Sequence, residues 1–155
     1  MLTTLRDEIK QNKPFESLEQ EAQLNILRTS SLLTDEIEQF LKPYGVTATQ
    51  YNVLRILRGA EPVGLCRNEL RDRMLTRMPD MTRLLDRMEE AGLVVRAREG
   101  EDRRMVLTRI TEKGRRLLDE LDAPVMALHR KQMAGLTDAQ LRSLSDLLTL
   151  VRDGG

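Results

Sequence analysis

Cysteine, histidine and aromatic residues are scarce in this 155-residue chain. It has one cysteine, Cys66, and one histidine, His129, with two Phe, two Tyr and no Trp. A single cysteine cannot build an internal disulfide framework, which favours a reducing compartment. Because this cysteine and histidine are far apart and lack metal-ligand spacing, we expect no metal site and no cofactor. His129 is expected at the surface or at an interface.

Long apolar runs are also missing. No segment approaches the roughly 20 apolar residues that a membrane-spanning helix needs, and the N-terminal stretch MLTTLRDEIKQNK lacks the apolar middle of a signal peptide. A composition of 40 % hydrophobic and 32 % charged residues is typical of a globular domain. These features predict a cytoplasmic protein without membrane contact, folded as a single domain over residues 1–155.

Catalytic signatures are absent as well. The chain has no Gly-rich phosphate loop and no Ser/His/Asp set with a usable histidine. We therefore expect a protein that is not an enzyme and has no catalytic residues. The few aromatic residues also offer little lining for a phenolic ligand, so the sequence leaves the existence of an effector open.

The charges are balanced overall but unevenly distributed. The formal net charge is zero, yet residues 63–116 carry 14 Lys+Arg against 10 Asp+Glu, and the rest carries 11 against 15. Thirteen of those 14 basic residues are arginines, whose forked guanidinium suits phosphate and guanine. The arginine-rich middle segment indicates a nucleic-acid surface.

The most informative stretch is EAGLVVRAREGEDRRMVLTRITEKG, residues 90–114. Gly92 suits a helix C-terminus, where positive φ is common. A β-prone run begins at Leu93, and Met105–Ile110 is predicted to be the return strand. The tip between the strands is rich in arginine, which the narrow minor groove of DNA attracts. A two-stranded ribbon of this kind directly after a helix predicts the wing of a winged helix-turn-helix.

Helical patterns surround this ribbon. Thr47 and Gln50 form a capping box, and Thr137 and Gln140 form a second one. Thr111 is predicted to cap a helix that Pro124 kinks or interrupts. Pro79 is predicted at the first helical position of the helix before the ribbon. The expected helices are Phe15–Leu41, a helix from Thr47 to Gly59, Leu65–Met74, Pro79–Ala91, Glu112–Met133 and a last helix after Thr137.

The sequence thus predicts a mainly α fold with a small two-stranded β wing. Its winged helix-turn-helix core spans residues 46–110, and residues 15–42 and 111–152 form flanking helices with long apolar stripes. Because these stripes find no obvious partner in one small domain, we expect the flanking helices to build a homodimer.

These residues resemble the MarR-type (multiple-antibiotic-resistance regulator) family of transcription factors. The family pattern D-R-R followed by L-T-x-K-G matches Asp102–Arg104 and Ile110–Gly114, with Ile110 in place of the leucine. Val46–Leu54 is similar to L-T-x-x-Q-x-x-V-L, and Thr82–Val94 is similar to the family's recognition helix and its exit. The resemblance implies a homodimer that binds palindromic double-stranded DNA near promoters, usually as a repressor, with many members released by a small-molecule signal.

Two groups of residues are candidates for DNA contact. In the wing, we expect one of Arg103 and Arg104 to enter the minor groove, with Asp102 stiffening the ribbon through the other. In and beside the recognition helix, base edges or phosphates are expected to meet four exposed side chains: Arg77, Thr82, Arg83 and Arg87. Asp80 is expected as a helix N-terminal charge or as an acceptor from cytosine.

A purely structural role for these arginines stays open. They could be ordinary solvated charges, with Arg83 and Arg87 paired to Asp86 and Glu90. Arg67 and Asn68 of the supporting helix are weaker candidates for phosphate contact.

Cys66 is expected to be a small core residue rather than a redox sensor, since the sequence shows no group that would stabilise its thiolate. The main hypothesis is a dimeric DNA-binding repressor released by a small molecule. The alternatives are a winged-helix module for protein–protein contact and a DNA binder without an effector. The sequence names no effector-binding residue.

Overall fold

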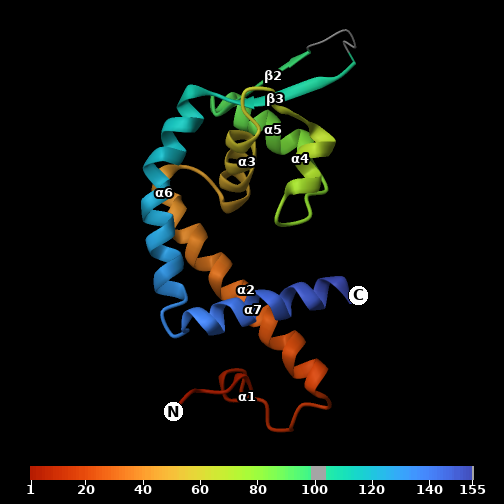
Figure 1. Cartoon of the computed structure of the whole chain (residues 1–155), viewed down its shortest axis with the longest axis vertical. Coiled ribbons are helices and arrows are strands. Elements are labelled where there is room, and N and C mark those ends of the chain that lie inside the picture. The colour runs from red at the N-terminus through yellow and green to blue at the C-terminus, as the bar shows by residue number, and fades with distance from the viewer. Residues whose placement is uncertain (99–103, 155) are drawn as a thin grey trace. The chain divides into compact units, whose positions relative to one another are not determined.

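The computed structural model describes residues 1–98 and 104–154 (Figure 1). The chain forms two compact units, Met1–Pro43 and Tyr44–Gly155. The first unit contains a short helix α1 (Leu5–Glu8) and a long helix α2 (Leu18–Leu41). The helix expected from Phe15 begins later, because the Ser17 hydroxyl caps it by accepting from the Gln20 N–H at 3.0 Å.

The second unit carries the remaining helices. Thr47 and Thr137 both form the predicted capping boxes, and the hydroxyl of Thr111 accepts from the Gly114 N–H at 3.1 Å as the predicted cap. A 3₁₀ turn η1 (Lys42–Tyr44) leads into this unit. Its α-helices are α3 (Ala48–Gly59), α4 (Arg67–Arg73), α5 (Met81–Glu90), α6 (Glu112–Gln132) and α7 (Asp138–Asp153).

The sheet has one strand more than the sequence predicted. Strands β2 (Val94–Arg98) and β3 (Val106–Ile110) form the expected antiparallel ribbon, and β1 (Leu65–Cys66) pairs with the other edge of β3. Leu65 and Cys66 were predicted to be helical, but they lie opposite Thr108 and Leu107 in this ladder. The mainly α fold with a β wing is confirmed, with a three-stranded sheet at the base of the wing.

The predicted first-turn position of Pro79 is wrong, and an interruption of the helix at Pro124 does not occur. Pro79 lies before α5 and not in its first turn, because the Asp80 side chain caps the helix by accepting from the Arg83 N–H at 3.0 Å. Pro124 does not interrupt α6, which runs continuously from Glu112 to Gln132. The buried side chains of Leu121 and Val125, on either side of this proline, anchor both halves of α6 to the core.

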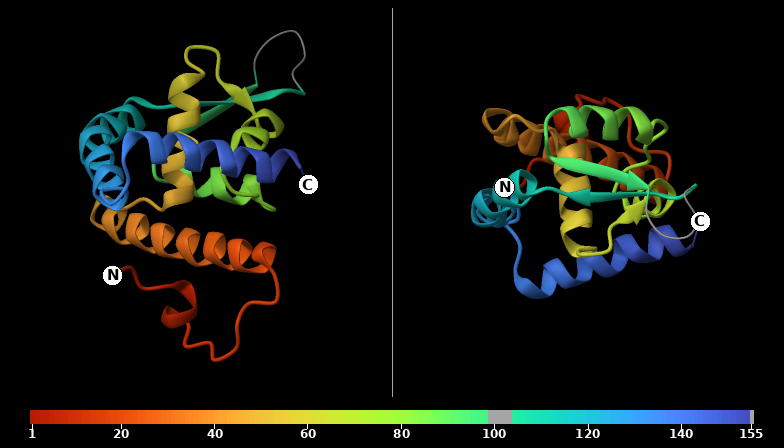
Figure 2. Two further views of the ribbon diagram at one scale, coloured as in Figure 1. Left: turned by 60° about the horizontal axis from the view of Figure 1, so that its bottom comes forward. Right: turned by 90° about the horizontal axis from the view of Figure 1, so that it is seen from above.

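The core of the second unit lies where α3, α4, α5 and α6 meet the sheet. The fully buried side chains there include Leu54, Leu57, Leu70, Leu85, Met88, Leu118 and Leu121. Figure 2 shows α5 running alongside β2, and α3 packs against both β3 and α6. In this way the core fixes α5 and the wing strands to one scaffold.

At Gly114 the backbone of α6 lies very close to the base of the wing. A Cβ atom at this position would lie 2.6 Å from the Leu93 carbonyl oxygen and 2.7 Å from Ile110 Cγ1. Since real Cβ atoms do not come so close, glycine alone lets the first turn of α6 lie against the base of the wing. This gives a physical reason for the glycine that ends the motif from Ile110 to Gly114.

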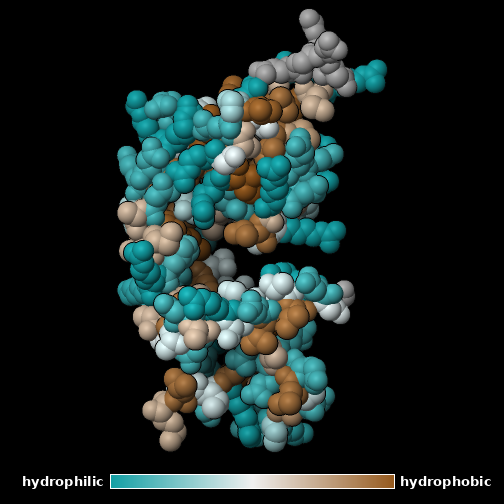
Figure 3. All heavy atoms as spheres, viewed as in Figure 1, coloured by the Kyte–Doolittle hydropathy of each residue, from teal (hydrophilic) through white to brown (hydrophobic). Residues whose placement is uncertain are grey.

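Helices α2 and α7 leave apolar side chains exposed. Only Leu41 of α2 is buried, and no residue of α7 is buried. Figure 3 shows apolar atoms of both helices at the molecular surface. Within the described parts of the chain, no helix has the length and hydropathy needed to span a membrane.

Candidate nucleic-acid interface

Helices α4 and α5 form a helix-turn-helix, joined by residues 74–80. The turn is tied to the scaffold by Asn52 of α3, whose side-chain oxygen accepts from the Leu75 N–H at 2.9 Å. On α5, Met81, Leu85 and Met88 are buried against the core. The remaining sides of α5 are therefore available for polar contacts.

One exposed stripe of α5 consists of Arg83 and Arg87, which are one helical turn apart. Arg77, in the preceding turn, is exposed as well. None of these three arginines makes a side-chain hydrogen bond or ion pair within residues 1–98 and 104–154. The pairing of Arg83 with Asp86 that the sequence left open does not occur, because the Asp86 carboxylate binds Arg96 instead.

Asp80 occupies the N-terminus of α5 as a cap. Its carboxylate accepts from the Arg83 N–H at 3.0 Å, which agrees with the first of its two expected roles. A carboxylate at this end of a helix satisfies an unpaired N–H and complements the helix dipole. The cap fixes the backbone at Arg83, the arginine nearest to the N-terminus of α5.

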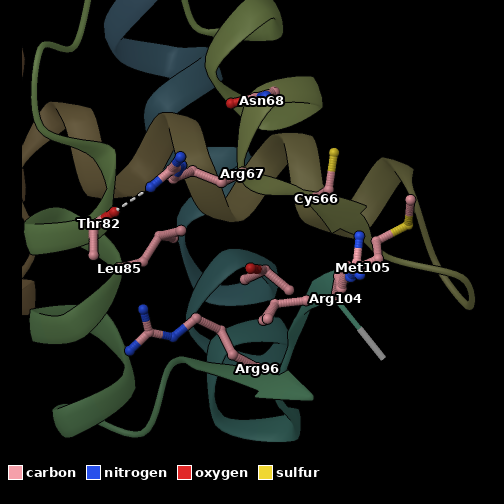
Figure 4. A pocket seen from close by; sticks show the side chains of 10 residues that line it. Cys66, Arg67, Asn68, Thr82, Leu85, Arg96, Arg104 and Met105 are labelled. Carbon is pink, nitrogen blue, oxygen red and sulfur yellow. Dashed lines mark hydrogen bonds between the residues drawn. The ribbon is translucent and has the colours of Figure 1, made fainter. Parts of the chain in front are cut away.

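A groove of about 540 Å³ separates α4 and α5 from the wing strands (Figure 4). On the side of the groove formed by the two helices, Arg67 Nη1 of α4 donates to Thr82 Oγ1 of α5 at 2.9 Å. A hydroxyl that accepts from an arginine can still donate its own hydrogen to a phosphate oxygen. Arg67 and Arg104 both line the groove, so it presents cationic groups from the supporting helix and from the wing. The sequence alone made Arg67 only a weak candidate.

The wing residues are only partly described. Arg104 is exposed at the start of the return segment and lies beside Met105 in Figure 4. The candidates Asp102 and Arg103 lie outside the described residues. The described strands carry the ribbon outward as far as the pair Arg98–Val106.

Sequence reasoning missed Arg96 of β2. Its Nη2 lies 2.6 Å from Asp86 Oδ1 and 3.1 Å from Glu89 Oε1, both on α5. Its backbone N–H also donates to Glu89 Oε2 at 3.0 Å. The pKa of the Glu89 carboxyl is lowered, chiefly by its hydrogen bond from the Arg96 side chain. One sequence signal could have indicated this interaction. Arg96 is two positions after Val94 on β2, so the two side chains lie on the same face of the strand, the face that packs toward the core.

The C-terminus of α5 is joined to the start of α6. The N–H groups of Gly92 and Leu93 donate to the Glu89 and Met88 carbonyls at 2.9 and 3.0 Å, and Gly92 has the predicted positive φ of 76°. Two residues of the motif after the wing complete the joint. Thr111 Oγ1 donates to the Gly92 carbonyl at 2.6 Å, and Lys113 Nζ donates to the Ala91 carbonyl at 2.7 Å. The recognition helix is thereby fixed to α6.

Cys66 is half-buried and caps α4, with its N–H donating to Glu69 Oε1 at 3.3 Å. It lines the groove and is not part of the fully buried core. In the part of the chain that the structure describes, no cluster of His, Cys, Asp and Glu could hold a metal ion.

A model of the MarR family matches residues 44–105, which include the helix-turn-helix and the first wing strand, β2. The crystal structure of a MarR transcription factor from Planctomyces limnophilus is 38 % identical to this chain, with a TM-score of 0.67, and the match covers 88 % of this chain and 99 % of that one. The chain belongs to the MarR family.

Two further MarR-family structures were solved with bound partners. A mutant MarR from E. coli in complex with operator DNA is 25 % identical, covers 96 % of this chain and 99 % of its own, and has a TM-score of 0.77. CouR from Rhodococcus jostii RHA1, bound to p-coumaroyl-CoA, is 28 % identical over 88 % of this chain and 95 % of its own, with a TM-score of 0.74.

Membership of the MarR family settles the class of protein. The chain is a DNA-binding transcriptional regulator with a winged helix-turn-helix and is not an enzyme. In MarR terms, α5 is the recognition helix, α4 the supporting helix, and β2 with β3 the wing.

Proposed function

We propose that this MarR-family protein is a homodimeric repressor that binds a palindromic operator and is released from it by a small molecule. The observation that carries the proposal is the exposed arginine stripe of α5, flanked by the cationic groove. Each step of the proposal rests on a separate feature of the molecule.

Recognition of the major groove falls to α5. Arg83 and Arg87 lie on one exposed stripe and Arg77 lies just before the helix, all without a partner in residues 1–98 and 104–154. Such arginines can form forked bonds with guanine edges or bind phosphates. We infer that Thr82, whose hydroxyl accepts from Arg67, donates its own hydrogen to a phosphate at the rim of the major groove of DNA.

Recognition of the minor groove falls to the wing. Arg104 lies at the start of its return segment and, with Arg103, supplies the cations that a narrow minor groove attracts. Asp102 is proposed to stiffen the tip by pairing with one of these arginines. The wing contact then adds to the affinity provided by α5.

Dimerisation is proposed for the exposed apolar stripes of the flanking helices, residues 15–42 and 111–152. On α7, Leu147, Leu150 and Val151 are each at least 60 % exposed. Burying such side chains against a second copy removes apolar surface from water. A symmetric dimer presents two recognition helices about one DNA turn apart, which matches a palindromic operator.

Release by a small molecule is supported by a second cavity, of about 640 Å³, beside the joint between α5 and α6. Lys113, Arg116 and Leu117 line it together with Glu112 and Glu120, and Arg116 pairs with Glu112 at 3.2 Å, so it offers apolar groups and charges of both signs. CouR shows that one relative binds an acyl-CoA ester. A ligand that binds better to a conformation with the wrong spacing of the two α5 helices would lower the affinity for DNA by that difference.

The testing experiment measures binding to DNA from the region upstream of the chain's own gene, in a salt series with random DNA as competitor. Tight binding that survives competitor and weakens steeply with salt is expected, because cationic side chains displace counterions from the phosphates. Arg83→Ala should abolish the preference for the specific site while residual binding to random DNA persists. The matched control is Arg142→Ala, an exposed arginine on α7.

Three outcomes would contradict parts of the proposal. Binding no better than to random DNA across operators selected from the whole genome would favour a winged helix for protein–protein contact. Specific binding by a monomer would contradict the dimer. Specific binding that no ligand in a broad screen of lipophilic anions weakens would favour a DNA binder without an effector.

A further inference from the structure

Arg96 lies in the outer part of the wing that the structure describes. It pairs with Thr108 across the ribbon, and the last paired residues, Arg98 and Val106, lie only two positions farther out. Strand residues two positions apart share a face, so Arg96 lies on the same face of β2 as the buried Val94. The side chain therefore extends toward α5, as Figure 4 shows.

The guanidinium of Arg96 is held by two carboxylates of α5. Nη2 donates to Asp86 Oδ1 at 2.6 Å and to Glu89 Oε1 at 3.1 Å, and the Arg96 backbone N–H donates to Glu89 Oε2 at 3.0 Å. The Arg96 side chain is 22 % exposed, whereas those of Asp86 and Glu89 are 53 % and 40 % exposed, so water screens these bonds in part. We call this cluster of Arg96, Asp86 and Glu89 the wing clamp.

The wing clamp is a polar connection between the recognition helix and the ribbon. Asp86 and Glu89 share a stripe of α5 with Thr82, next to the stripe of Arg83 and Arg87. A two-stranded ribbon alone is a weak structure and twists easily. Fixing β2 to α5 close to the last strand pair sets the direction in which the ribbon leaves the domain.

The wing clamp also has an electrostatic effect. Asp86 and Glu89 are exposed carboxylates on the helix that is proposed to enter the major groove. Without a cation beside them, they would repel the DNA phosphates. Arg96 neutralises one of these two negative charges. Its hydrogen bonds also hold both carboxylates on the side of α5 that faces the wing.

We propose that Arg96 is a positioning residue for operator binding, which holds the wing at the angle to α5 that lets both enter adjacent grooves. The proposal rests on the proposed wing contact, and it assigns Arg96 no contact with DNA. Arg96→Gln should weaken operator binding at least about tenfold, which corresponds to about 1.4 kcal/mol. Protection of the outer minor grooves from hydroxyl radicals should be lost, and protection of the major groove by α5 should remain.

The decisive experiment is a double-mutant cycle between Arg96→Gln and Arg104→Ala. If Arg96 acts by placing the wing, Arg96→Gln should have little further effect once Arg104 has been removed. Arg58→Gln is the matched control, since it removes a similar forked ion pair, with Asp122, that lies between α3 and α6. This control should leave the minor-groove footprint in place. Melting curves establish that each variant is folded, and Arg96→Lys serves in the same cycle if Arg96→Gln does not fold.

Two results would overturn the proposal. If the effects of Arg96→Gln and Arg104→Ala simply add, Arg96 does not act through the wing. If the triple variant Arg96→Gln, Asp86→Asn, Glu89→Gln regains full affinity, the role of Arg96 is only to neutralise charge. A failure of the proposed wing contact itself is recognised separately, because Arg104→Ala alone would then leave affinity and minor-groove protection unchanged.

Discussion

Helices α3 and α7 begin in the same way but lie in opposite surroundings. Each starts with a capping box in which a threonine, Thr47 or Thr137, and a glutamine three residues later exchange hydrogen bonds with the backbone. Each carries an apolar stripe. In α3 the stripe is buried, whereas in α7 no residue is buried. The buried side chains of α3 are Tyr51, Val53, Leu54 and Leu57.

The comparison shows that two requirements of a helix are independent. One is a cap at its start, and the other is a partner that buries its apolar side. Caps are local and form from neighbouring residues in either setting. Burial needs a partner, which α3 finds in α6 and the sheet. In a single chain the apolar stripe of α7 stays exposed to water. This exposure is the physical basis for the proposal that a second copy of the chain covers it.

The largest expected effect comes from truncating the buried stripe. Leu57→Ala should lower the free energy of unfolding by about 2–5 kcal/mol, because it removes a fully buried side chain and leaves a cavity. Leu147→Ala, at a side chain that is 60 % exposed, should change the stability of the monomer by less than about 0.5 kcal/mol. Urea unfolding at a low protein concentration, where the monomer dominates, measures both. Equal losses would mean that α7 is packed within its own chain.

The second effect concerns association. Leu147→Glu places a charge in the proposed dimer interface, so it should shift the protein toward monomers and weaken operator binding strongly, since a monomer loses one of two half-sites. Sedimentation equilibrium and DNA titration measure the two effects. Thr149→Glu introduces the same charge on the opposite side of α7 and should leave the dimer intact. Dissociation by the control variant alone would place the interface on the other side of the helix.

The comparison of α3 with α7 also explains which parts of the fold could be predicted from the sequence. Most signals between neighbours were interpreted correctly, with Pro79 as an exception: both capping boxes, the cap at Thr111 and the positive φ of Gly92 are present. Features that depend on distant pairing were not. Strand β1 exists because Leu65 lies opposite Thr108, and nothing near Leu65 in the sequence indicates that pairing.

The candidate site divides in the same way. The exposed arginines of α5 could be predicted because helical spacing separates them from Met81, Leu85 and Met88. The wing clamp could not be, since the interaction of Arg96 with Asp86 requires β2 and α5 to be packed side by side. The bond between Arg67 and Thr82 likewise depends on how α4 and α5 are arranged.

A third prediction uses the caps themselves. Thr47→Ala should lower the free energy of unfolding of the second unit by about 1 kcal/mol, because an orphan N–H at the start of α3 loses its acceptor. Thr137→Ala removes the same bond from α7 and should cost a similar amount of helix stability. We expect the loss from Thr137→Ala to appear mainly as weaker dimerisation, because α7 is part of the proposed dimer interface. Thermal melts over a range of protein concentrations distinguish a loss of monomer stability from weaker dimerisation. If the melting temperatures of both variants depended on concentration in the same way, the role of α7 in dimerisation would be contradicted.

The smallest expected effect concerns the ion pair that joins α3 to α6. Within the described residues, the exposed helix α7 has no counterpart to it. Arg58 donates to both carboxylate oxygens of Asp122, at 2.9 and 2.8 Å, and this hydrogen bonding lowers the pKa of Asp122 in the folded protein. A lowered pKa gives stability that is present above the unfolded value of about 4 and is lost as the pH falls through the folded value. Asp122→Asn should therefore destabilise the protein at pH 7 by about 1 kcal/mol or less, since Asp122 is 47 % exposed.

The same variant should match the wild type in stability at a pH below the folded pKa of Asp122, where the wild-type carboxyl is protonated. Urea unfolding at a series of pH values measures this convergence. Asp119→Asn is the graded control, because its single contact with Arg58 is longer, at 3.4 Å, and it should cost less at every pH. A constant difference between Asp122→Asn and wild type across the series would show that packing, and not the ion pair, joins α3 to α6 at this point.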